Sequence, residues 1–350
     1  MCDSLSAAPP ESVHVVRDSA SGLDGVIVLH STRRGPAAGG CRLWRYADSA
    51  GMARDAARLA EGMAYKNALA DLPLGGGKAV LNLPTGPFDR GRLFAAFGRE
   101  VARLNGAYVT AEDVGTSVVD MQAVRTTCTH VAGLAAVEGR PGGDPSPWTA
   151  LGVFLAMREA ARRKFGADLQ GMTVAVQGLG SVGSQLCGLL HEAGAKLVVA
   201  EPRSSVAAAV ACRTGATVVG LDSILDARCE IFAPCALGAV IDERSVARLR
   251  ARIVCGAANN VLATDEDGDR LADNGVLYAP DYVVNAGGII NVAAEYLGWS
   301  VDDAEARVRQ TDRRLAEVLD FADRRGLAPH RAADLLARQR IAATTSVRAA

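Results

Sequence analysis

The stretch TVAVQGLGSVGSQLCGLLHEAGAKLVVAE, from Thr173 to Glu201, decides the fold of this chain. It opens with a short apolar run at 174–176, typical of a strand that is buried on both faces. The pattern G-x-G-x-x-G follows at Gly178, Gly180 and Gly183 and leads directly into a helical pattern. A second apolar run, 197–200, ends in Glu201. Strand, glycines, helix, strand and acid are in the order that a dinucleotide-binding unit requires.

Each part of this stretch has a physical task. Gly178 permits a tight turn, Gly180 lets the backbone approach a pyrophosphate, and Gly183 lets the helix pack closely on the strand. The free N–H groups at the start of the helix bind the diphosphate. The carboxylate of Glu201 can accept hydrogen bonds from a ribose 2′-hydroxyl.

The composition excludes several classes of function. The 350 residues, 49% of them apolar, have room for roughly two domains with cores of their own. A net charge of −1 provides no basic surface for nucleic acid or an anionic membrane, and no apolar run is long enough for a membrane span. Eight scattered cysteines without a C-x-x-C pair indicate core residues in a reducing cytoplasm. We therefore expect a cytoplasmic protein without disulfides or a metal site.

Lysine is rare in this chain, which directs attention to the few that occur. Of the 38 basic residues only four are lysine, and Lys164 and Lys196 look like solvated surface charges. Lys66 extends the apolar stripe of a helix predicted over 52–70, which consists of Met52, Ala56, Leu59 and Met63. Lys78 follows three glycines and directly precedes a short strand predicted at 79–81. The two lysines can converge on one site of carboxylate size.

Two further segments of the first half are ambiguous. The run GPAAGG at 35–40 favours a flexible turn, although paired glycines also let a ligand touch the backbone. The segment 108–115 reads as a strand that ends in Glu112 and Asp113. These two acids can be catalytic groups at the end of a buried strand, or they can cap a helix that begins near Thr116. The residues favour neither alternative.

The second half alternates strands and helices after a linker rich in proline and glycine at 139–147. This alternation predicts a doubly wound parallel sheet with its ligands at the carboxyl ends of the strands. Loops at those ends carry Pro234 and three asparagines, Asn259, Asn260 and Asn285, which favour recognition of an amide. Beyond them we predict a strand at 282–284, one long helix at 301–324 and a final helix at 329–341.

The order of motifs resembles the glutamate/leucine/phenylalanine/valine dehydrogenase family, and is most similar to its leucine dehydrogenase branch. The stretches that carry the resemblance span nearly the whole chain: GPAAGGCRLWRY (35–46), EGMAYKNALADLPLGGGKAV (61–80), NGAYVTAEDVGT (105–116), DPSPWTALGV (144–153), VAVQGLGSVG (174–183), IFAPCALGA (231–239), VCGAANN (254–260) and YAPDYVVNAGGIINVA (278–293).

The resemblance implies a reaction and an architecture. The reaction is the reversible oxidative deamination of an L-amino acid to its 2-oxo acid and ammonia, with NAD as the cofactor. The fold is α/β, with an N-terminal α/β substrate domain at 1–142 and a doubly wound Rossmann domain at 143–325. The C-terminal helix, within 326–350, packs back on the first domain, and a cleft lies between the two. The resemblance also implies a homo-oligomer of at least two subunits.

The resemblance assigns roles to individual residues. Lys66 pairs with the substrate carboxylate, Lys78 activates the attacking water, and Asp113 moves the proton to and from the amino group. Gly40 contributes its backbone to the substrate, and Asn260 contacts both substrate and nicotinamide. The residues expected around the substrate side chain are Ala38, Ala111, Ile289 and Val292. Those expected around the cofactor are Thr149, Gly178, Gly180, Ser181, Val182, Gly183, Glu201, Arg203, Ala233, Pro234, Cys235, Ala257, Asn259 and Asn285.

The chemistry of these residues agrees with the implied reaction. Attack of water on an imine needs a base that works near neutrality, and a lysine beside another cation in a closed cleft has a lowered pKa. Because Ile289 and Val292 share a helix face and are stiff, they favour leucine, valine or isoleucine over an aromatic substrate. Ala38 frees volume and favours the aromatic alternative. A non-catalytic nicotinamide sensor is the alternative of another class, but it has no need of Lys66, Lys78 and Asp113.

Overall fold

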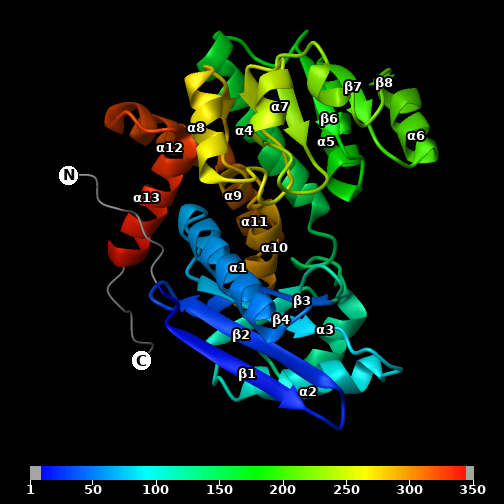
Figure 1. The fold of residues 1–350 in the computed structure, drawn as a ribbon, viewed down its shortest axis with the longest axis vertical. Coiled ribbons are helices and arrows are strands. Elements are labelled where there is room, and N and C mark those ends of the chain that lie inside the picture. The colour runs from blue at the N-terminus through cyan, green and yellow to red at the C-terminus, as the bar shows by residue number, and fades with distance from the viewer. Residues whose placement is uncertain (1–8, 344–350) are drawn as a thin grey trace. The chain divides into compact units, whose positions relative to one another are not determined.

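The computed structural model describes residues 9–343, and this part of the chain forms two compact units (Figure 1). The first contains the described residues up to Gly143, the segment Val292–Ser300 and the described residues from Ala337 onward. The second contains Asp144–Asn291 and Val301–Leu336. The chain passes between them near 143, inside the proline- and glycine-rich linker. It also returns to the first unit in the short segment Val292–Ser300, which the sequence assigned to the Rossmann domain.

The first unit is built on a five-stranded sheet in the order β1-β2-β4-β3-β5. Its strands are β1 (Ser12–Asp18), β2 (Leu23–Ser31), β3 (Ala37–Trp44), β4 (Gly75–Asn82) and β5 (Tyr108–Glu112). Its helices are α1 (Ser49–Leu69), α2 (Arg90–Ala102) and α3 (Val118–Arg125), together with parts of α10 (Gly287–Leu297) and α13 (Pro329–Ala343). β3 pairs in parallel with both β4 and β5, whereas β1 and β2 are antiparallel additions.

Alternating side chains build a separate core on each face of this sheet, as the period of two in a strand requires. On one face Ile27, Ala79 and Leu81 pack with Phe94 and Phe97 of α2. On the other face the valines of β2 and β4 pack against α1, which crosses this face in Figure 1. The buried stripe of α1 begins on the predicted one at Met52 and Ala56 and continues through Ala60, Ala64 and Ala68. Leu59, Met63 and Lys66 are only half-buried.

The glycines of β3 and β4 correct the prediction of a flexible turn at 35–40. A Cβ on Gly39 would lie 1.9 Å from the carbonyl oxygen of Gly77, and one on Gly76 would lie 2.2 Å from the backbone nitrogen of Ala64. Both distances are far shorter than atoms allow, so these positions must be glycine for the strands and α1 to pack. The glycines therefore serve close packing inside a regular sheet.

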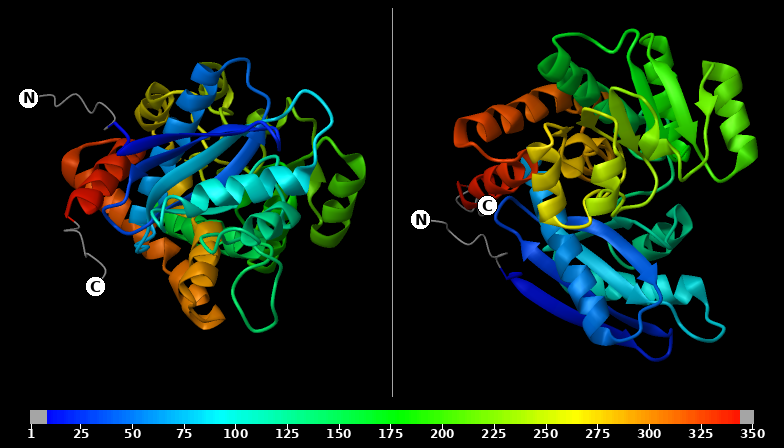
Figure 2. Two further views of the ribbon diagram at one scale, coloured as in Figure 1. Left: turned by 90° about the horizontal axis from the view of Figure 1, so that it is seen from below. Right: turned by 45° about the horizontal axis from the view of Figure 1, so that its top comes forward.

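The second unit contains a six-stranded parallel sheet in the order β11-β10-β9-β6-β7-β8, flanked by helices (Figure 2). Its strands are β6 (Thr173–Gln177), β7 (Lys196–Ala200), β8 (Thr217–Val218), β9 (Ile231–Pro234), β10 (Ile253–Val254) and β11 (Leu277–Tyr278). The chain moves outward from β6 through β7 to β8, and then returns to β9 on the other side of β6. This reversal confirms the doubly wound α/β fold, and it lies between β6 and β9, the position at which folds of this kind bind their ligands.

The helices of this unit depart from the sequence pattern in several places, because the pattern predicts neither the helix at 243–248 nor the short 3₁₀ helix at 224–226. They are α4 (Ser146–Phe165), α5 (Ser181–Glu192), α6 (Ser204–Thr214), η1 (Ile224–Asp226), α7 (Glu243–Arg248), α8 (Asp265–Asp273), α9 (Asp281–Val284), α11 (Val301–Val308) and α12 (Thr311–Arg325), with parts of α10 and α13. The strand predicted at 282–284 is the short helix α9. The helix predicted at 301–324 is divided into α11 and α12, where the hydroxyl of Thr311 donates to the carbonyl of Val308.

Candidate functional site

The predicted catalytic residues of the first unit lie on one face of its sheet. Successive side chains of a strand alternate between the faces, so Lys78 shares the face of Val80, which packs against α1. In β3 the residues Cys41 and Leu43 belong to the core on the opposite face, so Arg42 lies on the α1 face with Lys78. Parallel pairing of Gly40 with Ala111 brings the end of β5, and Asp113 after it, to the same place.

The carboxylate of Asp113 forms ion pairs with two cationic side chains. The Nζ of Lys78 lies 2.8 Å from its Oδ2, and the Nε of Arg42 donates to the same oxygen at 3.1 Å. The Lys78 side chain is only 6% exposed. Burial acts to raise the pKa of Asp113, but the Lys78 ammonium and the Arg42 guanidinium outweigh it and hold that pKa below its ordinary value. A buried ammonium is thus balanced by a carboxylate that stays ionised.

The structure excludes one of the two alternatives that the sequence left open for Glu112 and Asp113, that of capping the next helix. The N-cap of α3 is Ser117, and Asp120 completes its capping box, so neither Glu112 nor Asp113 caps that helix. The peptide N–H of Asp113 donates instead to the hydroxyl of Thr116 at 2.8 Å. This turn fixes the backbone of Asp113 and directs its side chain toward Lys78.

A second carboxylate, which sequence reasoning missed, lies behind Arg42. The Nη1 of Arg42 is 3.1 Å from Oδ2 of Asp55 in α1, and the hydroxyl of Tyr46 donates to the same oxygen at 2.5 Å. Burial first, and then this hydrogen bond, raise the pKa of Tyr46. Arg42 therefore joins the predicted catalytic acid to α1. The sequence does contain a signal for Arg42, because this residue is two positions after Gly40. Two positions apart means the same face only in a strand, so the signal can be used only once 37–44 is known to be a strand.

Gly40 and its neighbours complete this face. A Cβ on Gly40 would lie 2.8 Å from the Cβ of Asp113 and 2.5 Å from the carbonyl oxygen of Glu112, so only glycine lets the acid lie so close. Ala38 and Ala111 are buried and small. Lys66 is in the last turn of α1 and half-buried. The convergence of Lys66 with Lys78 on one carboxylate remains a prediction.

The two residues predicted on α10 belong to different units. Val292 is in the first unit and Ile289 in the second. Within the first unit, the carboxylate of Glu295 accepts the backbone N–H groups of Gly133 and Leu134 at 2.8 and 3.1 Å. This contact fixes the C-terminal part of α10 beside the segment that follows α3. The contribution of Ile289 and Val292 to a common pocket wall stays a prediction.

In the second unit, the three motif glycines differ in what surrounds them. Gly178 has a φ of +91°, and a Cβ there would lie 2.6 Å from that of Ala236 in the loop after β9. A Cβ on Gly183 would lie 2.1 Å from the carbonyl oxygen of Gly178, so the helix packs directly on the turn. A Cβ on Gly180 would meet nothing within 4 Å. Packing explains the first and the third glycine, and open space beside the second leaves room for a ligand.

Ser181 and Val182 are the first residues of α5, whose N-cap Gly180 provides no side-chain acceptor. Their backbone N–H groups are available to an anion at this helix start. The open side of Gly180 lies at the same place. These observations fit a diphosphate bound at the start of α5.

Glu201, the predicted ribose-binding acid, directly follows β7. Its Oε2 accepts the backbone N–H of Leu179 at 2.8 Å, and its Oε1 accepts the Nε of Arg203 at 2.6 Å. The Arg203 hydrogen bond is the largest of the effects that lower the pKa of Glu201 to about 2. The side chain of Glu201 is 4% exposed, whereas that of Arg203 is 61% exposed. An ionised carboxylate is thus held against the glycine-rich turn.

The loops after β9 and β10 bring the remaining predicted cofactor residues to the same sheet edge. The peptide N–H of Cys235 donates to the carbonyl of Gln177, which adjoins the glycine turn, and that of Ala258 donates to Pro234. The side-chain N–H₂ of Asn285 donates to the carbonyl of Ala257 at 3.2 Å and to Oδ1 of Asn259 at 3.0 Å. Ala233 is the buried residue of β9 before Pro234.

Asn285 and Asn260 are each placed by a specific feature. The Oδ1 of Asn285 is buried and accepts no hydrogen bond from the described residues, although buried acceptors ordinarily do. Asn260 adopts a left-handed φ of +52°, which asparagine tolerates, and its peptide N–H donates to the buried carboxylate of Asp281. Asp281 is a second residue that sequence reasoning missed.

Thr149, in the first turn of α4, lies beside the Gly287–Gly288 pair that begins α10.

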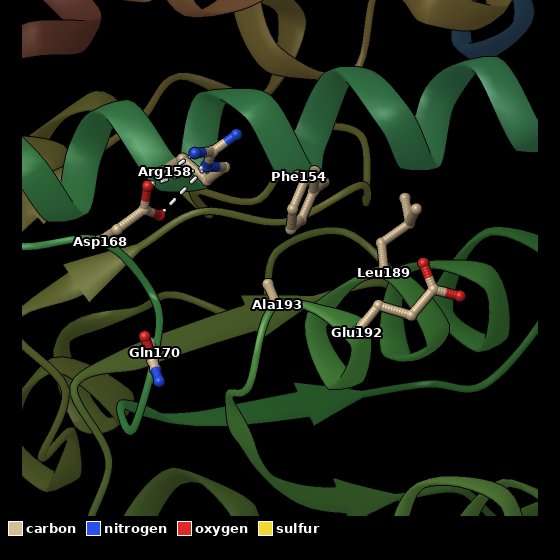
Figure 3. Close-up of a pocket in the computed structure, with 7 residues that line it drawn as sticks. All are labelled: Phe154, Arg158, Asp168, Gln170, Leu189, Glu192 and Ala193. Atoms are coloured by element: carbon tan, nitrogen blue, oxygen red, sulfur yellow. Dashed lines mark hydrogen bonds and ion pairs between the residues drawn. The ribbon is translucent and has the colours of Figure 1, made fainter.

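The structure also contains a hollow of about 430 Å³ that is separate from this edge (Figure 3). It is lined by Phe154, Arg158, Asp168, Gln170, Leu189, Glu192 and Ala193. Gln170 precedes β6 and Ala193 precedes β7, so the hollow lies at the amino ends of these strands. Arg158 is already bound to Asp168 by two guanidinium nitrogens. The hollow therefore belongs to neither predicted site.

Between residues 9 and 343, no group of three or more His, Cys, Asp or Glu side chains could hold a metal ion. The seven cysteines in this range are free, and Cys2 lies outside it. No helix within the same range combines the length and the apolar character that crossing a bilayer requires.

Comparison with protein families identifies the two halves of the chain. Residues 10–130 match a family model described as "Glu/Leu/Phe/Val dehydrogenase, dimerisation domain". Residues 145–209 and 199–349 match "Glutamate/Leucine/Phenylalanine/Valine dehydrogenase". The two models together cover nearly the whole chain.

Individual relatives agree with this result. A leucine dehydrogenase of Thermoactinomyces intermedius is 44% identical over 95% of this chain and 90% of its own length. A valine dehydrogenase of Streptomyces coelicolor is also 44% identical, over 95% of this chain and 92% of its own. Among solved structures, an L-tryptophan dehydrogenase from Nostoc punctiforme is 36% identical, with a TM-score of 0.85 over 96% of this chain and 97% of that one.

Proposed function

Because the chain belongs to the glutamate/leucine/phenylalanine/valine dehydrogenase family, we propose that it converts a branched-chain L-amino acid reversibly to the 2-oxo acid and ammonia, with NAD as the cofactor. It is an amino acid dehydrogenase with a nicotinamide cofactor, and its substrates are small molecules. The single observation that carries the proposed chemistry is the pairing of buried Lys78 with Asp113 at 2.8 Å. This pair provides a proton-transfer group of each charge in one place.

We propose the following division of labour among the residues. Lys66 pairs with the carboxylate of the amino acid and so fixes its orientation. Asp113 accepts a proton from the substrate amino group, and Lys78, in its neutral form, accepts one from the water that attacks the imine. A bound nicotinamide would supply the acceptor for the hydride from the α-carbon. Asn260 is proposed to contact the substrate and the nicotinamide.

The cofactor residues fit a dinucleotide in three respects. The open side of Gly180 and the free N–H groups of Ser181 and Val182 suit the diphosphate. The ionised Glu201 suits ribose hydroxyls and repels a 2′-phosphate, which is the basis for proposing NAD over NADP. The unpartnered Oδ1 of Asn285 suits a donor such as the carboxamide N–H₂ of a nicotinamide.

The substrate class rests on the relatives and on the small residues of the first unit. Leucine and valine dehydrogenases are each 44% identical to this chain. The tryptophan dehydrogenase structure supports a second candidate, an aromatic L-amino acid, because Ala38 and Ala111 leave volume beside Gly40. A methylene group in an apolar pocket discriminates by only about 1–3 kcal/mol, so activity on several apolar amino acids is expected.

One experiment separates these candidates. Formation of reduced nicotinamide is followed by absorbance with L-leucine, L-valine, L-phenylalanine and L-tryptophan, and kcat/KM is compared. The highest value for leucine or valine supports the proposal, and the highest value for either aromatic replaces it by the second candidate. A chain that binds NAD but oxidises none of a full panel of L-amino acids would be a nicotinamide sensor.

We also propose that the enzyme is a cytoplasmic homo-oligomer. The family model that matches residues 10–130 is described as a dimerisation domain. The free cysteines of the described residues suit a reducing compartment. Sedimentation at micromolar concentration tests the assembly, and a species of 36.3 kDa would exclude it.

A further inference from the structure

The cluster of Arg42, Asp113, Asp55 and Tyr46 contains one guanidinium between two carboxylates. Arg42 donates to Asp113 through Nε and to Asp55 through Nη1, both at 3.1 Å. The side chains of Arg42, Asp55 and Asp113 are 21%, 19% and 24% exposed, so solvent screens their charges only in part. The proposed chemistry uses Lys78 and Asp113, and it leaves Arg42 and Asp55 without a task.

We propose that Arg42 is a positioning residue that holds the carboxylate of Asp113 in its ionised form beside Lys78, and that Asp55 moderates this effect by sharing the guanidinium. The inference rests on the role proposed for Asp113 in proton transfer. It goes beyond that role because it states which other residues decide when Asp113 can accept a proton.

The geometry explains why arginine is needed at position 42. A planar guanidinium presents donors in a fixed fork, so Nε and Nη1 can reach two carboxylates at once. Arg42 and Lys78 both approach Oδ2 of Asp113, so Oδ1 is engaged by neither of them. One oxygen is therefore fixed by cations while the other faces elsewhere, which orients the carboxylate as well as charging it.

Asp55 and Tyr46 hold the other end of the guanidinium. The hydroxyl of Tyr46 donates to Oδ2 of Asp55, the oxygen that Arg42 also uses, and Arg58 donates to Oδ1 at 3.3 Å. With these donors the Asp55 carboxylate has few ways to rotate. Because α1 carries both Asp55 and the proposed substrate anchor Lys66, the same helix supports both ends of the proposed reaction site.

The groups that act on the ionisation of Asp113 come from three elements. Lys78 of β4 and Arg42 of β3 favour the charged carboxylate. Asp55 of α1 shares the guanidinium of Arg42, and in the proposal it therefore weakens the effect of Arg42 on Asp113. On the opposite face of the sheet the nearest titratable groups are Cys41 and Tyr108, whose pKa values burial raises, so both stay neutral. The balance among Lys78, Arg42 and Asp55 thus sets the state of Asp113.

The test uses the full chain and two independent readouts. The first is the titration of the Asp113 carboxyl carbon by NMR in the ligand-free protein, assigned by its loss in Asp113→Asn. The second is the acid limb of the pH profile of kcat/KM for the best amino acid. In Arg42→Gln the titration midpoint and the acid limb should both rise by about one pH unit, since a neighbouring cation lowers a carboxyl pKa by about 1–3.

Two variants keep the test decisive if Arg42→Gln folds poorly. Arg42→Lys retains the charge and should move the midpoint by less than half the change in Arg42→Gln, although it loses the second contact. Asp55→Asn removes the competing negative charge and should move the midpoint in the opposite direction, to lower pH. Arg45→Gln is the matched control, because Arg45 is exposed and paired with neither carboxylate.

The outcomes are distinguishable. An unchanged midpoint in Arg42→Gln, or a rise in Asp55→Asn, would overturn the inference. A shifted midpoint without activity on any L-amino acid would uphold the role of Arg42 and reject the proposed function, because the NMR titration needs no substrate. Equal shifts in Arg42→Gln and Arg45→Gln would assign the effect to net charge and overturn the positioning role.

Discussion

The Nζ of Lys78 and the Oδ2 of Asp113 lie 2.8 Å apart, although Lys78 is in β4 and Asp113 directly follows β5, which is not a neighbour of β4 in the sheet. β3 lies between β4 and β5, and it contributes Gly40 and Arg42 at this level. Gly40 leaves the space across which the two side chains meet. The pair therefore depends on the absence of a side chain on the intervening strand.

Replacement of Lys78 by alanine should chiefly lower kcat, by about 10²- to 10⁴-fold, the usual contribution of a general base. Replacement of Lys66 by alanine should chiefly raise KM for the amino acid, since it removes a partner of the carboxylate. Steady-state kinetics on both variants checks this split. Lys196→Ala is the control, because Lys196 is exposed at the start of β7. Near-normal turnover by Lys78→Ala would refute its role as the base.

Replacement of Gly40 by alanine should lower kcat and destabilise the first unit. The new methyl group would lie 2.8 Å from the Cβ of Asp113, so the acid must move away from Lys78. Overpacking of this kind costs about 1–3 kcal/mol. Gly62→Ala in α1 is the matched control: a Cβ there meets nothing within 4 Å, and the change should stabilise the helix by up to about 1 kcal/mol. Thermal unfolding and kcat are measured for both.

The two glycines of the nucleotide motif should respond differently to alanine. At Gly180 the methyl group meets only open space, and φ is −67°, so stability should change by no more than about 1 kcal/mol while KM for NAD rises. At Gly183 the methyl group would lie 2.1 Å from the carbonyl of Gly178, and the unit should lose about 1–3 kcal/mol. Thermal unfolding without cofactor separates the two. A large stability loss in Gly180→Ala would mean that packing, not a ligand, requires this glycine.

Cofactor preference should depend on Glu201 and Arg203 in opposite ways. Glu201→Gln removes the charge that repels a 2′-phosphate and should raise kcat/KM for NADP relative to NAD. Arg203→Ala removes the exposed cation beside it and should lower any activity with NADP. Because the pKa of Glu201 is lowered to about 2, the preference should not change between pH 5 and 9. Equal efficiency of the unmodified enzyme with both cofactors would contradict the proposal of NAD.

The Asp168 carboxylate should stabilise the second unit only above acidic pH. The hydrogen bond from Arg158 is the largest effect and lowers the pKa of Asp168 (Figure 3). Burial acts to raise that pKa, but the hydrogen bonds from Leu169 and Arg162 add to the effect of Arg158, so the net shift is downward. A lowered pKa stabilises the folded state above the ordinary aspartate value of about 4, and that stability is lost as the pH falls through the folded value. Asp168→Asn should therefore lower Tm at pH 7 and differ less from the parent at pH 3. Solvent screening of this 39% exposed side chain limits the effect to about 1 kcal/mol or less. A Tm difference that is constant with pH would count against the linkage.

The sequence by itself determined the second unit and the reaction class. The period of two in short apolar runs, three glycines at fixed spacing and an acid at the next strand end are local signals, and each acts over fewer than 30 residues. The structure contains the elements that these local signals predict, because each element depends mainly on residues close to it in the sequence. The strand predicted at 282–284 shows the limit: this short segment is helix α9 instead, where the hydroxyl of Tyr282 contacts Asp334 and the carbonyl of His330 in α13.

Only the tertiary structure decided how the first unit builds its charged cluster. GPAAGG has the local preferences of a turn, but close packing of β3 on β4 and α1 requires glycine inside a strand, and that demand outweighs local propensity. Once this segment is a strand, Arg42 lies on the face of Lys78, 36 positions away in the sequence, and meets Asp55 and Asp113 from two further elements. No spacing in the sequence encodes that meeting. It results from parallel pairing, which places distant residues at one level of a sheet.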